Sequence, residues 1–570
     1  MMVMADGSTS STSEPNFSDS EKEVVSGRGR GRGRGRLSRG RCVANTNKKQ
    51  NQKASCQNTV ASGQNTIARM QLLSEGESVE TSDTDETKRI QGAMSRQAGR
   101  LKRKACSSTS SGPEGSSDHY SLIEFANHIV NNILSEEDID QLHKIQDTFT
   151  LGELCAGMGT GTIVAAVLER ALESKGLKTN LDTAFFTESV SWKRQLCHDI
   201  YKHVQGEHHT IELFGKTAEL ANQRPPMQCD ICVSAIECDD ISMCSGTPKS
   251  VLDRSGKSGA SFCEFVDFLR NLPFQQRPKF LVVECVASLG KMRRSVNEKG
   301  TTAVSQTLRE LWFTGEWRTL NTRKFGLPQS RTRVYGVFVL MTIGFGSPGE
   351  QTHKGQLNKI WSFCDRCQIQ MPESLHSLLL RSDLLEQSEK NDERDTQKKS
   401  KGKKGKKGTK WIEEHKKFRE NNCLVDDQLD WHPALKALQQ QQQQLNLTER
   451  ELDASLLALA TALKRKGAST SCFSMPVGDS LHFMKVSTSC HPCLLPKKKY
   501  LYIVENKCYV SGKAAILPLM LQGLGPNEIN LAGPAVQALT ASQAQDLAGN
   551  AFTSNIVLAI MLGVLLHYGQ

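Results

Sequence analysis

The chain has 570 residues, 38% of them hydrophobic, and a formal net charge of +11. This length predicts one to three domains, and the basic excess, which is concentrated in runs, indicates a polyanionic partner, with nucleic acid the leading class. The longest apolar stretch, residues 556–566, is too short to cross a bilayer, so we expect a buried helix there and no membrane segment.

Cysteine usage and the N-terminal residues indicate where the protein works. The 18 cysteines lack the spacing of a disulfide framework, and the first residues contain no apolar stretch of the kind that forms a secretory signal. We therefore expect a reducing, intracellular compartment in which the cysteines are mostly free thiols.

Residues 1–117 are expected to be a disordered, basic tail. They are rich in Ser, Thr, Gln, Asn and Gly with almost no aromatic residues, so they cannot bury enough apolar surface to offset the entropy of ordering. Within them, seven arginines alternate mostly with glycine, the first being Arg28 and the last Arg41. Such a flexible cationic ribbon suits phosphate contacts or a minor groove. A targeting signal or a solvated tail is the alternative.

Residues 118–345 are expected to form an α/β domain with a mostly parallel sheet covered by helices on both faces. An apolar stretch with helical spacing, 122–145, comes first, and strand and helix patterns then alternate. The runs LVVEC and VYGVFVL are continuously apolar, as expected for strands buried on both faces. The expected strands are 149–154, 183–187, 229–236, 279–284, 317–321 and 333–341, and the expected helices 161–173, 191–203, 261–271 and 301–313.

Residues 346–485 are expected to be a smaller insertion with flexible segments. They contain eight lysines, of which Lys398 is the first and Lys410 the last, then a run of glutamines at 439–444, and an amphipathic helix pattern at 445–466. Residues 486–570 are expected to return to the main domain. They contain strand patterns at 500–504 and 508–510 and a strongly apolar final helix at 550–566.

Two features of the first half indicate a nucleoside-binding site. Gly157, Gly159 and Gly161 form a glycine-rich turn between a strand and a helix, where the backbone can turn sharply and approach a ligand. Glu188 ends the next strand, a position from which an acid reaches both hydroxyls of a ribose. Each feature alone also fits an ordinary turn or strand end, whereas the pair at this spacing favours a nucleoside cofactor.

Reactive side chains lie at the ends of three later strands. Cys238 and Glu284 lie at the carboxyl ends of two of them, where sheets of this kind bind ligands. A thiol and an acid that converge there suit covalent activation of an electron-poor ring. Arg331 and Arg333 alternate into a further strand and are expected on one face, where they would hold a phosphate or a base carbonyl.

The paired cysteines elsewhere do not indicate a metal site. Cys229 with Cys232, and Cys364 with Cys367, have a two-residue spacing, but no second pair or histidine partner lies at a suitable distance in the sequence. Buried structural thiols are the plainer interpretation, and no metal is expected.

In their order along the chain, these elements resemble the C5-cytosine methyltransferase family. AGMGTG resembles its cofactor loop, TES its ribose-binding acid, and ECDDIS its Pro-Cys-Gln segment, while ECV resembles Glu-Asn-Val and PQSRTRVYGV resembles Gln-x-Arg-x-Arg. LPLMLQGLGP resembles the Leu-Gln-Gly-Phe-Pro segment and AGNAFTSNIVLAI the closing Gly-Asn-Ala motif. The resemblance covers residues 149–341 and 486–567 and implies a Rossmann-like fold of the class I S-adenosylmethionine-dependent type.

The resemblance implies a role for each matching residue. Cys238 would add to C6 of a flipped-out cytosine, Glu284 would hold N3 and the exocyclic amine, and Arg331 and Arg333 would hold the base carbonyl and orient the acid. S-adenosylmethionine would supply the methyl group to C5. The residues implied at the cofactor are Cys155, Ala156, Gly157, Met158, Gly159, Gly161, Glu188, Ser189, Asn550 and Ala551. The insertion would be the target-recognition region, with its lysines on phosphates.

Several positions depart from the family pattern. The proline before the nucleophile is Glu237 here, and the glutamine after it is Asp239, followed by Asp240. Anions beside a thiol disfavour the thiolate unless they point away or bind cations. An aromatic residue of the cofactor loop is replaced by Cys155, and the asparagine of Glu-Asn-Val by Cys285.

Three functions remain open from the sequence. The leading hypothesis is a DNA cytosine methyltransferase in the nucleus, since the long basic tail suits DNA better than a compact RNA substrate. The second is the tRNA-methylating branch, which shares this catalytic core. The third is a regulatory scaffold that binds S-adenosylmethionine and DNA without chemistry, which the acidic neighbours of Cys238 favour.

Overall fold

The computed structural model describes residues 121–568 with interruptions, and these residues all belong to one compact unit, Gly112–Gln570. The tail 1–117 and most of the lysine run lie outside the described residues. The interruptions are 146–147, 207–210, 224–225, 243–244, 246–247, 292–298, 342–348, 370–374, 381–409, 425–428, 430, 467–471, 479, 482–483, 497 and 511–515.

A seven-stranded sheet forms the centre of the main lobe, in the order β3-β2-β1-β4-β5-β8-β6. The first five strands in that order run parallel, and β8 runs antiparallel to both of its neighbours. This arrangement confirms the expected mostly parallel α/β fold. The strands are β1 (Thr148–Leu154), β2 (Asn180–Thr187), β3 (Glu212–Phe214), β4 (Ile231–Ala235), β5 (Phe280–Val286), β6 (Phe313–Asn321) and β8 (Thr332–Leu340).

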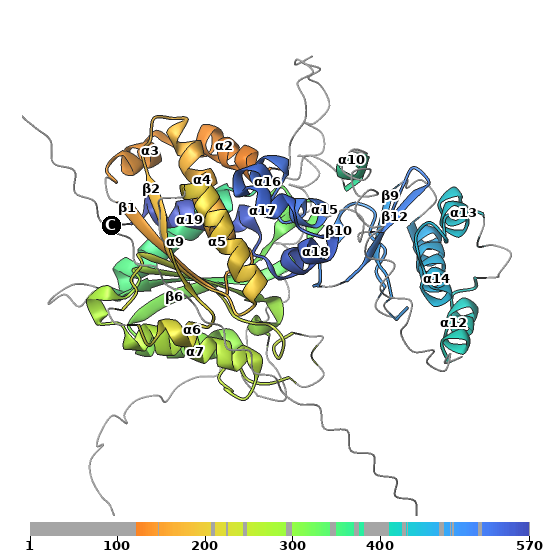
Figure 1. Cartoon of the computed structure of the whole chain (residues 1–570), viewed down its shortest axis with the longest axis horizontal. Coiled ribbons are helices and arrows are strands. Elements are labelled where there is room, and N and C mark those ends of the chain that lie inside the picture. Colours follow the sequence, from red (N-terminus) through yellow and green to blue (C-terminus); the bar gives the residue numbers. More distant parts are fainter. Residues whose placement is uncertain are drawn as a thin grey trace, which may run out of the picture. The chain divides into compact units, whose positions relative to one another are not determined.

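Helices cover both faces of the sheet, with α4 and α5 on one side and α6 and α7 on the other (Figure 1). Each face has its own buried apolar cluster, because strands inside a parallel sheet must bury both surfaces. The helices on the first face are α2 (Leu122–Asn132), α3 (Glu136–His143), α4 (Thr160–Glu173), α5 (Ser191–Gln205), α9 (Gly349–Arg366) and α19 (Ser554–Leu566), and those on the second are α6 (Thr217–Leu220), α7 (Lys257–Asn271) and α8 (Gly300–Glu310).

The first and the last of the expected helical segments differ from the structure. The pattern 122–145 forms two helices instead of one, because Ser135 caps α3 in a capping box with Asp138 and the chain turns before it. The closing helix begins at Ser554, whereas Asn550 is the last residue of α18 (Ala541–Asn550). Every residue of α19 is buried, as expected for a helix packed between α4 and α9.

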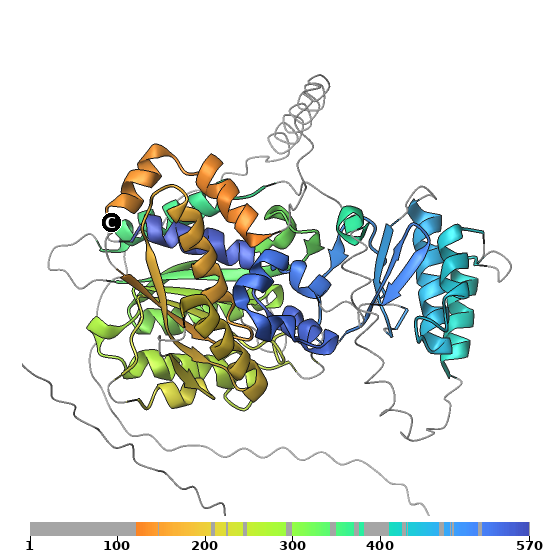
Figure 2. The same cartoon turned by 45° about the horizontal axis from the view of Figure 1, so that its top comes forward.

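The small lobe consists of a three-stranded sheet with helices against one face (Figure 2). Its strands are β9 (Cys472–Pro476), β11 (Tyr500–Val504) and β12 (Lys507–Val510), and the helices of that face are α12 (Lys410–Asn421), α13 (Pro433–Gln440) and α14 (Glu449–Lys466). Helix α10 (Leu375–Leu380) contacts β11 from the other face, where its leucines join the buried cluster of the main lobe. Part of the glutamine run thus ends α13, and the amphipathic helix begins at Glu449 rather than 445.

The boundaries of the small lobe differ from the expected 346–485. Helix α9 packs on the main sheet against β6 and β8, and β11, from beyond residue 485, pairs with β9. A periodic pattern shows that an element exists, but long-range strand pairing decides which sheet it joins.

Short elements connect the two lobes. Strand β10 (His491–Pro492) pairs in parallel with β7 (Gln329–Ser330), just before β8. The chain then returns through α15 (Ile516–Met520), α16 (Pro526–Ala532), α17 (Pro534–Gln537) and α18. Three 3₁₀ turns complete the described elements: Phe274–Gln276, Ala287–Gly290 and Thr322–Lys324. Within the described residues no single helix is long and apolar enough to span a membrane. Taken together, α18 and α19 reach the necessary length and apolar composition, but the two helices are bent by 43° relative to each other.

Candidate active site

The glycine-rich turn follows β1 and leads into α4. Gly157 (φ 63°) and Gly159 (φ 70°) adopt the left-handed conformation that glycine accommodates most easily. A Cβ atom on Gly157 would meet no heavy atom within 4 Å, so this backbone lies against open space. The turn therefore leaves the room in which a ligand can approach the main chain.

A buried carboxylate that the sequence interpretation missed holds this turn in place. Glu153, at the end of β1, is fully buried and accepts hydrogen bonds from the backbone N–H groups of Gly161 (3.0 Å) and Thr162 (3.3 Å). Burial raises the pKa of Glu153 to about 7, while these bonds act in the opposite direction. The sequence offered one indication of this role, because Glu153 is a charged residue inside an apolar strand directly before the glycine motif.

Glu188 lies at the tip of β2, directly beside the glycine turn. Its Oε2 accepts a hydrogen bond from the N–H of Gly157 at 2.9 Å, and its Oε1 accepts one from Val190 at 2.9 Å. The carboxylate therefore lies against the glycine turn, and Glu188 and Gly157 line the same cavity.

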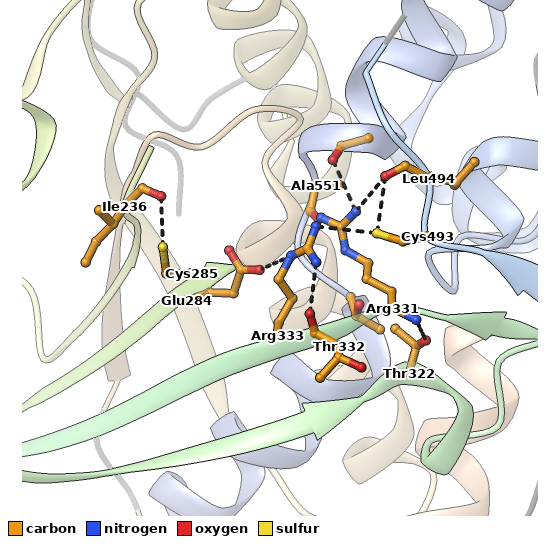
Figure 3. Close-up of polar contacts among 12 residues, drawn as sticks. Ile236, Glu284, Cys285, Thr322, Arg331, Thr332, Arg333, Cys493, Leu494 and Ala551 are labelled. Carbon is orange, nitrogen blue, oxygen red and sulfur yellow. Dashed lines mark hydrogen bonds and ion pairs between the residues drawn. The ribbon is translucent and has the colours of Figure 1, made fainter. Parts of the chain in front are cut away.

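Cys238 lies in a tight turn after β4, and its side chain is partly exposed. The N–H groups of Ile241 and Ser242 donate to its carbonyl oxygen at 3.2 and 2.7 Å. Partial burial raises the pKa of the thiol; Arg333 opposes this effect, and Glu284 and Asp239 add to it. A nearby thiol, Cys285, is fully buried and donates to the carbonyl oxygen of Ile236 (Figure 3), so Cys238 is the more accessible nucleophile of the two.

Two of the acidic neighbours of Cys238 have partners of their own. Asp240 accepts a hydrogen bond from the N–H of Ser258 at 3.0 Å, and the hydroxyl of Ser258 accepts one from the N–H of Asp240 at 3.0 Å. Asp239 forms an ion pair with Lys257 at 2.8 Å. These contacts direct Asp240 to the start of α7 and partly neutralise Asp239. Glu237 lines the cavity, and burial raises its pKa.

Glu284 and Arg333 form a buried ion pair at the ends of β5 and β8 (Figure 3). The Nε of Arg333 lies 3.1 Å from Oε1 of Glu284, and the side chains are 12% and 9% exposed. Burial raises the pKa of Glu284, and the positive charge of Arg333 limits that rise. The pair comes from adjacent antiparallel strands, which explains why residues about 50 positions apart meet.

Arg331 contacts the backbone instead of Glu284. Its guanidinium donates hydrogen bonds to the carbonyl oxygens of Leu494 (3.3 Å), Gly549 (3.1 Å) and Ala551 (2.8 Å) (Figure 3). It is 2% exposed. These bonds fix the segment after β10 and the C-terminal end of α18 to the main sheet, so the two arginines differ in what they hold.

A single cavity of about 620 Å³ brings most of the expected site residues together. Of the catalytic set, all four residues line it: Cys238, Glu284, Arg331 and Arg333. Of the expected cofactor set, the lining includes Cys155, Gly157, Glu188, Ser189 and Asn550. Ala156, Met158 and Ala551 are instead buried in the core, Gly159 is the N-cap residue of α4, and the N–H of Gly161 donates to Glu153.

The structure also adds residues that the sequence did not single out. Lys193 and Asp546 line the cavity and form an ion pair at 2.8 Å. The sulfur of Cys493 accepts a hydrogen bond from the guanidinium of Arg333 at 3.7 Å.

Among the described residues, no three His, Cys, Asp or Glu side chains gather where they could hold a metal ion.

The comparisons identify the family. A family model described as C-5 cytosine-specific DNA methylase matches residues 149–462, which is more than half of the chain. The chain therefore belongs to the C-5 cytosine-specific DNA methylase family, and the resemblance seen in the sequence is confirmed.

Individual relatives match shorter stretches. The chain is 30% identical over 117 residues to the type II methyltransferase M.Sau3AI of Staphylococcus aureus and 29% identical over 106 residues to the type II methyltransferase M2.BsuMI of Bacillus subtilis (strain 168). These matches cover 20% and 19% of this chain, and the chain spans about a quarter of each relative, 26% and 25%. The crystal structure of the S. pombe Dnmt2 methyltransferase matches 73% of this chain and 98% of its own, with 13% identity and a TM-score of 0.37.

Proposed function

We propose that this protein transfers a methyl group from S-adenosylmethionine to carbon 5 of cytosine in DNA. The observation that carries the proposal is the shared cavity, in which Cys238 and the Glu284–Arg333 pair line the same space as Gly157 and Glu188. Membership of the C-5 cytosine-specific DNA methylase family supports the same reaction.

The cavity fits the proposed cofactor. A volume of about 620 Å³ lies within the usual range for small-molecule sites. Gly157 leaves open space beside the backbone, and Glu188 supplies a carboxylate for ribose hydroxyls. Cys155, Ser189 and Asn550 complete the proposed cofactor wall. Bound S-adenosylmethionine supplies an electrophilic methyl group.

The protein's own residues would activate the base. The thiolate of Cys238 adds to C6 of a cytosine that has left the helix, and the new S–C6 bond makes C5 nucleophilic. Glu284 hydrogen-bonds N3 and the exocyclic amine, which favours this addition, and Arg333 orients Glu284. After C5 takes the methyl group, loss of the C5 proton and elimination of the thiol restore the ring and the free enzyme.

The proposal extends to the partners and the compartment. The arginines between Arg28 and Arg41 and the lysines between Lys398 and Lys410 would contact phosphates without reading sequence. We propose a nuclear location, on the grounds of these basic clusters and of a DNA substrate, with the small lobe as the target-recognition region.

Transfer of a labelled methyl group to duplex DNA and to tRNA tests the reaction and its substrate. We expect label on DNA with the wild-type chain and none with Cys238→Ser. Duplex DNA that contains 5-fluorocytosine should form a covalent adduct with the wild type only, because fluorine at C5 blocks the final elimination. Label on tRNA alone would favour the RNA branch. Absence of both label and adduct, with intact S-adenosylmethionine binding, would favour a scaffold.

A further inference from the structure

We propose that Lys193 and Asp546 form a subsite for the amino-acid end of S-adenosylmethionine. The ammonium of Lys193 would hold the ligand's carboxylate, and the carboxylate of Asp546 would hold its α-ammonium. This inference rests on the proposed function, because it assigns part of the cavity to a part of the proposed cofactor.

Lys193 and Asp546 form an ion pair in the wall of the cavity. The Nζ of Lys193, on α5, lies 2.8 Å from Oδ2 of Asp546, on α18, and the side chains are 7% and 16% exposed. Both residues line the same cavity as Glu188, Gly157 and Asn550. The pair therefore places one positive and one negative group next to each other, at a wall that a ligand can reach.

The stability of the fold does not by itself explain why Lys193 and Asp546 are paired at a largely buried position. Removing a lysine and an aspartate from water costs free energy that their mutual attraction often fails to recover. An ammonium has three donors, and among the described residues Asp546 is the only ion-pair partner found for Lys193. A ligand carboxylate would use the remaining donors and add a second favourable charge contact.

The position of the pair matches the layout of the proposed cofactor. Glu188 directly follows β2, and Lys193 lies in the first turn of the next helix, α5, so the proposed ribose acid and the lysine are neighbours along the chain. Asp546 is one helical turn before Asn550, whose side-chain amide donates to the carbonyl oxygen of Asp546 at 2.9 Å. The amino-acid end is a zwitterion, and the pair offers the complementary charges.

The other cations of the cavity have different surroundings. Arg333 is paired with Glu284, Lys257 with Asp239, and the guanidinium of Arg331 with main-chain carbonyls. Lys216 follows β3 and lies just before the short helix α6. Only Lys193, among the cations that line the described cavity, is paired with an acid next to the glycine-asparagine segment that ends α18.

Calorimetric binding of two ligands to the full-length protein tests the inference. S-adenosylmethionine carries the amino-acid end, whereas 5′-methylthioadenosine keeps the adenosine and the sulfur but lacks it. The variants are Lys193→Gln and Asp546→Asn, and Lys202→Gln is the matched control, because it lies on the same helix and is exposed. Thermal unfolding without ligand checks that each variant folds.

We expect each variant of the pair to bind S-adenosylmethionine at least about tenfold more weakly, as for a lost charge-assisted contact. Affinity for 5′-methylthioadenosine should stay within about threefold of the wild type, which is within the context-dependent spread of weak contacts. The control should change neither affinity. Equal weakening of both ligands, or no change in either, would overturn the inference. If the wild type bound neither ligand, the proposed function itself would fail instead.

Discussion

Replacing Glu153 with glutamine tests whether a buried acid fixes the entrance to α4. The wild-type carboxylate is fully buried under the glycine turn and accepts hydrogen bonds from the N–H groups of Gly161 and Thr162. Glutamine keeps the size of the side chain but carries no charge at any pH. The substitution therefore removes the titration of this site while leaving the turn filled.

The expected magnitude follows from the pKa of this carboxyl group. Burial raises the pKa from 4.5 to about 7, which corresponds to about 3 kcal/mol at roughly 1.4 kcal/mol per pKa unit. Because the folded-state pKa is raised, this stability is fully present below about pH 4.5 and is lost as the pH rises through about 7. The difference between the free energies of unfolding of the wild type and of Glu153→Gln should therefore decrease by about 3 kcal/mol as the pH rises from about 4.5 to above about 7.

Urea denaturation of the full-length wild type and of Glu153→Gln, at a series of pH values from 4.5 to 8, measures this difference. Glu310→Gln, on the exposed end of α8, is the control and should leave the pH dependence of stability unchanged. The reasoning would be refuted if the wild type and Glu153→Gln showed parallel curves over the whole range, because the carboxyl would then titrate as it does in the unfolded chain.

Three further predictions concern Arg331, Cys238 and Lys257, which line the proposed catalytic cavity. Arg331→Met should lower the free energy of unfolding by about 3–5 kcal/mol, because three buried carbonyl oxygens lose their hydrogen-bond donor. Arg254→Met, which removes an exposed ion pair with Asp267, is the control. An equal loss of stability in the two variants would contradict this prediction. The rate of adduct formation with 5-fluorocytosine DNA should rise nearly tenfold per pH unit from about pH 7 to 9, because burial raises the pKa of Cys238 and only the thiolate attacks; a flat profile would argue against a thiolate-limited step. Lys257→Met should slow the same adduct about two- to fivefold by leaving Asp239 uncompensated beside the thiol. Adding Asp239→Asn should restore the rate, and a double variant as slow as the single one would exclude this electrostatic effect.

The sequence alone determined the fold class and most of the site. Apolar runs and the alternation of strands with helices predicted the parallel sheet, because a strand covered on both faces needs apolar residues throughout. The glycine turn, Glu188, Cys238 and Glu284 were found because ligands of such sheets bind at the carboxyl ends of strands. Helix α19 was evident from its composition alone. β3 was missed because three residues give too short a pattern.

Tertiary structure decided which side chains meet. Arg331 and Arg333 look equivalent in the sequence, but only Arg333 is paired with Glu284, whereas Arg331 binds the backbone of segments more than 160 positions away. Lys193 and Asp546 are likewise brought together from distant helices. Local patterns encode the elements and the strand ends, but ion pairs depend on how the chain packs, and no local pattern specifies that packing.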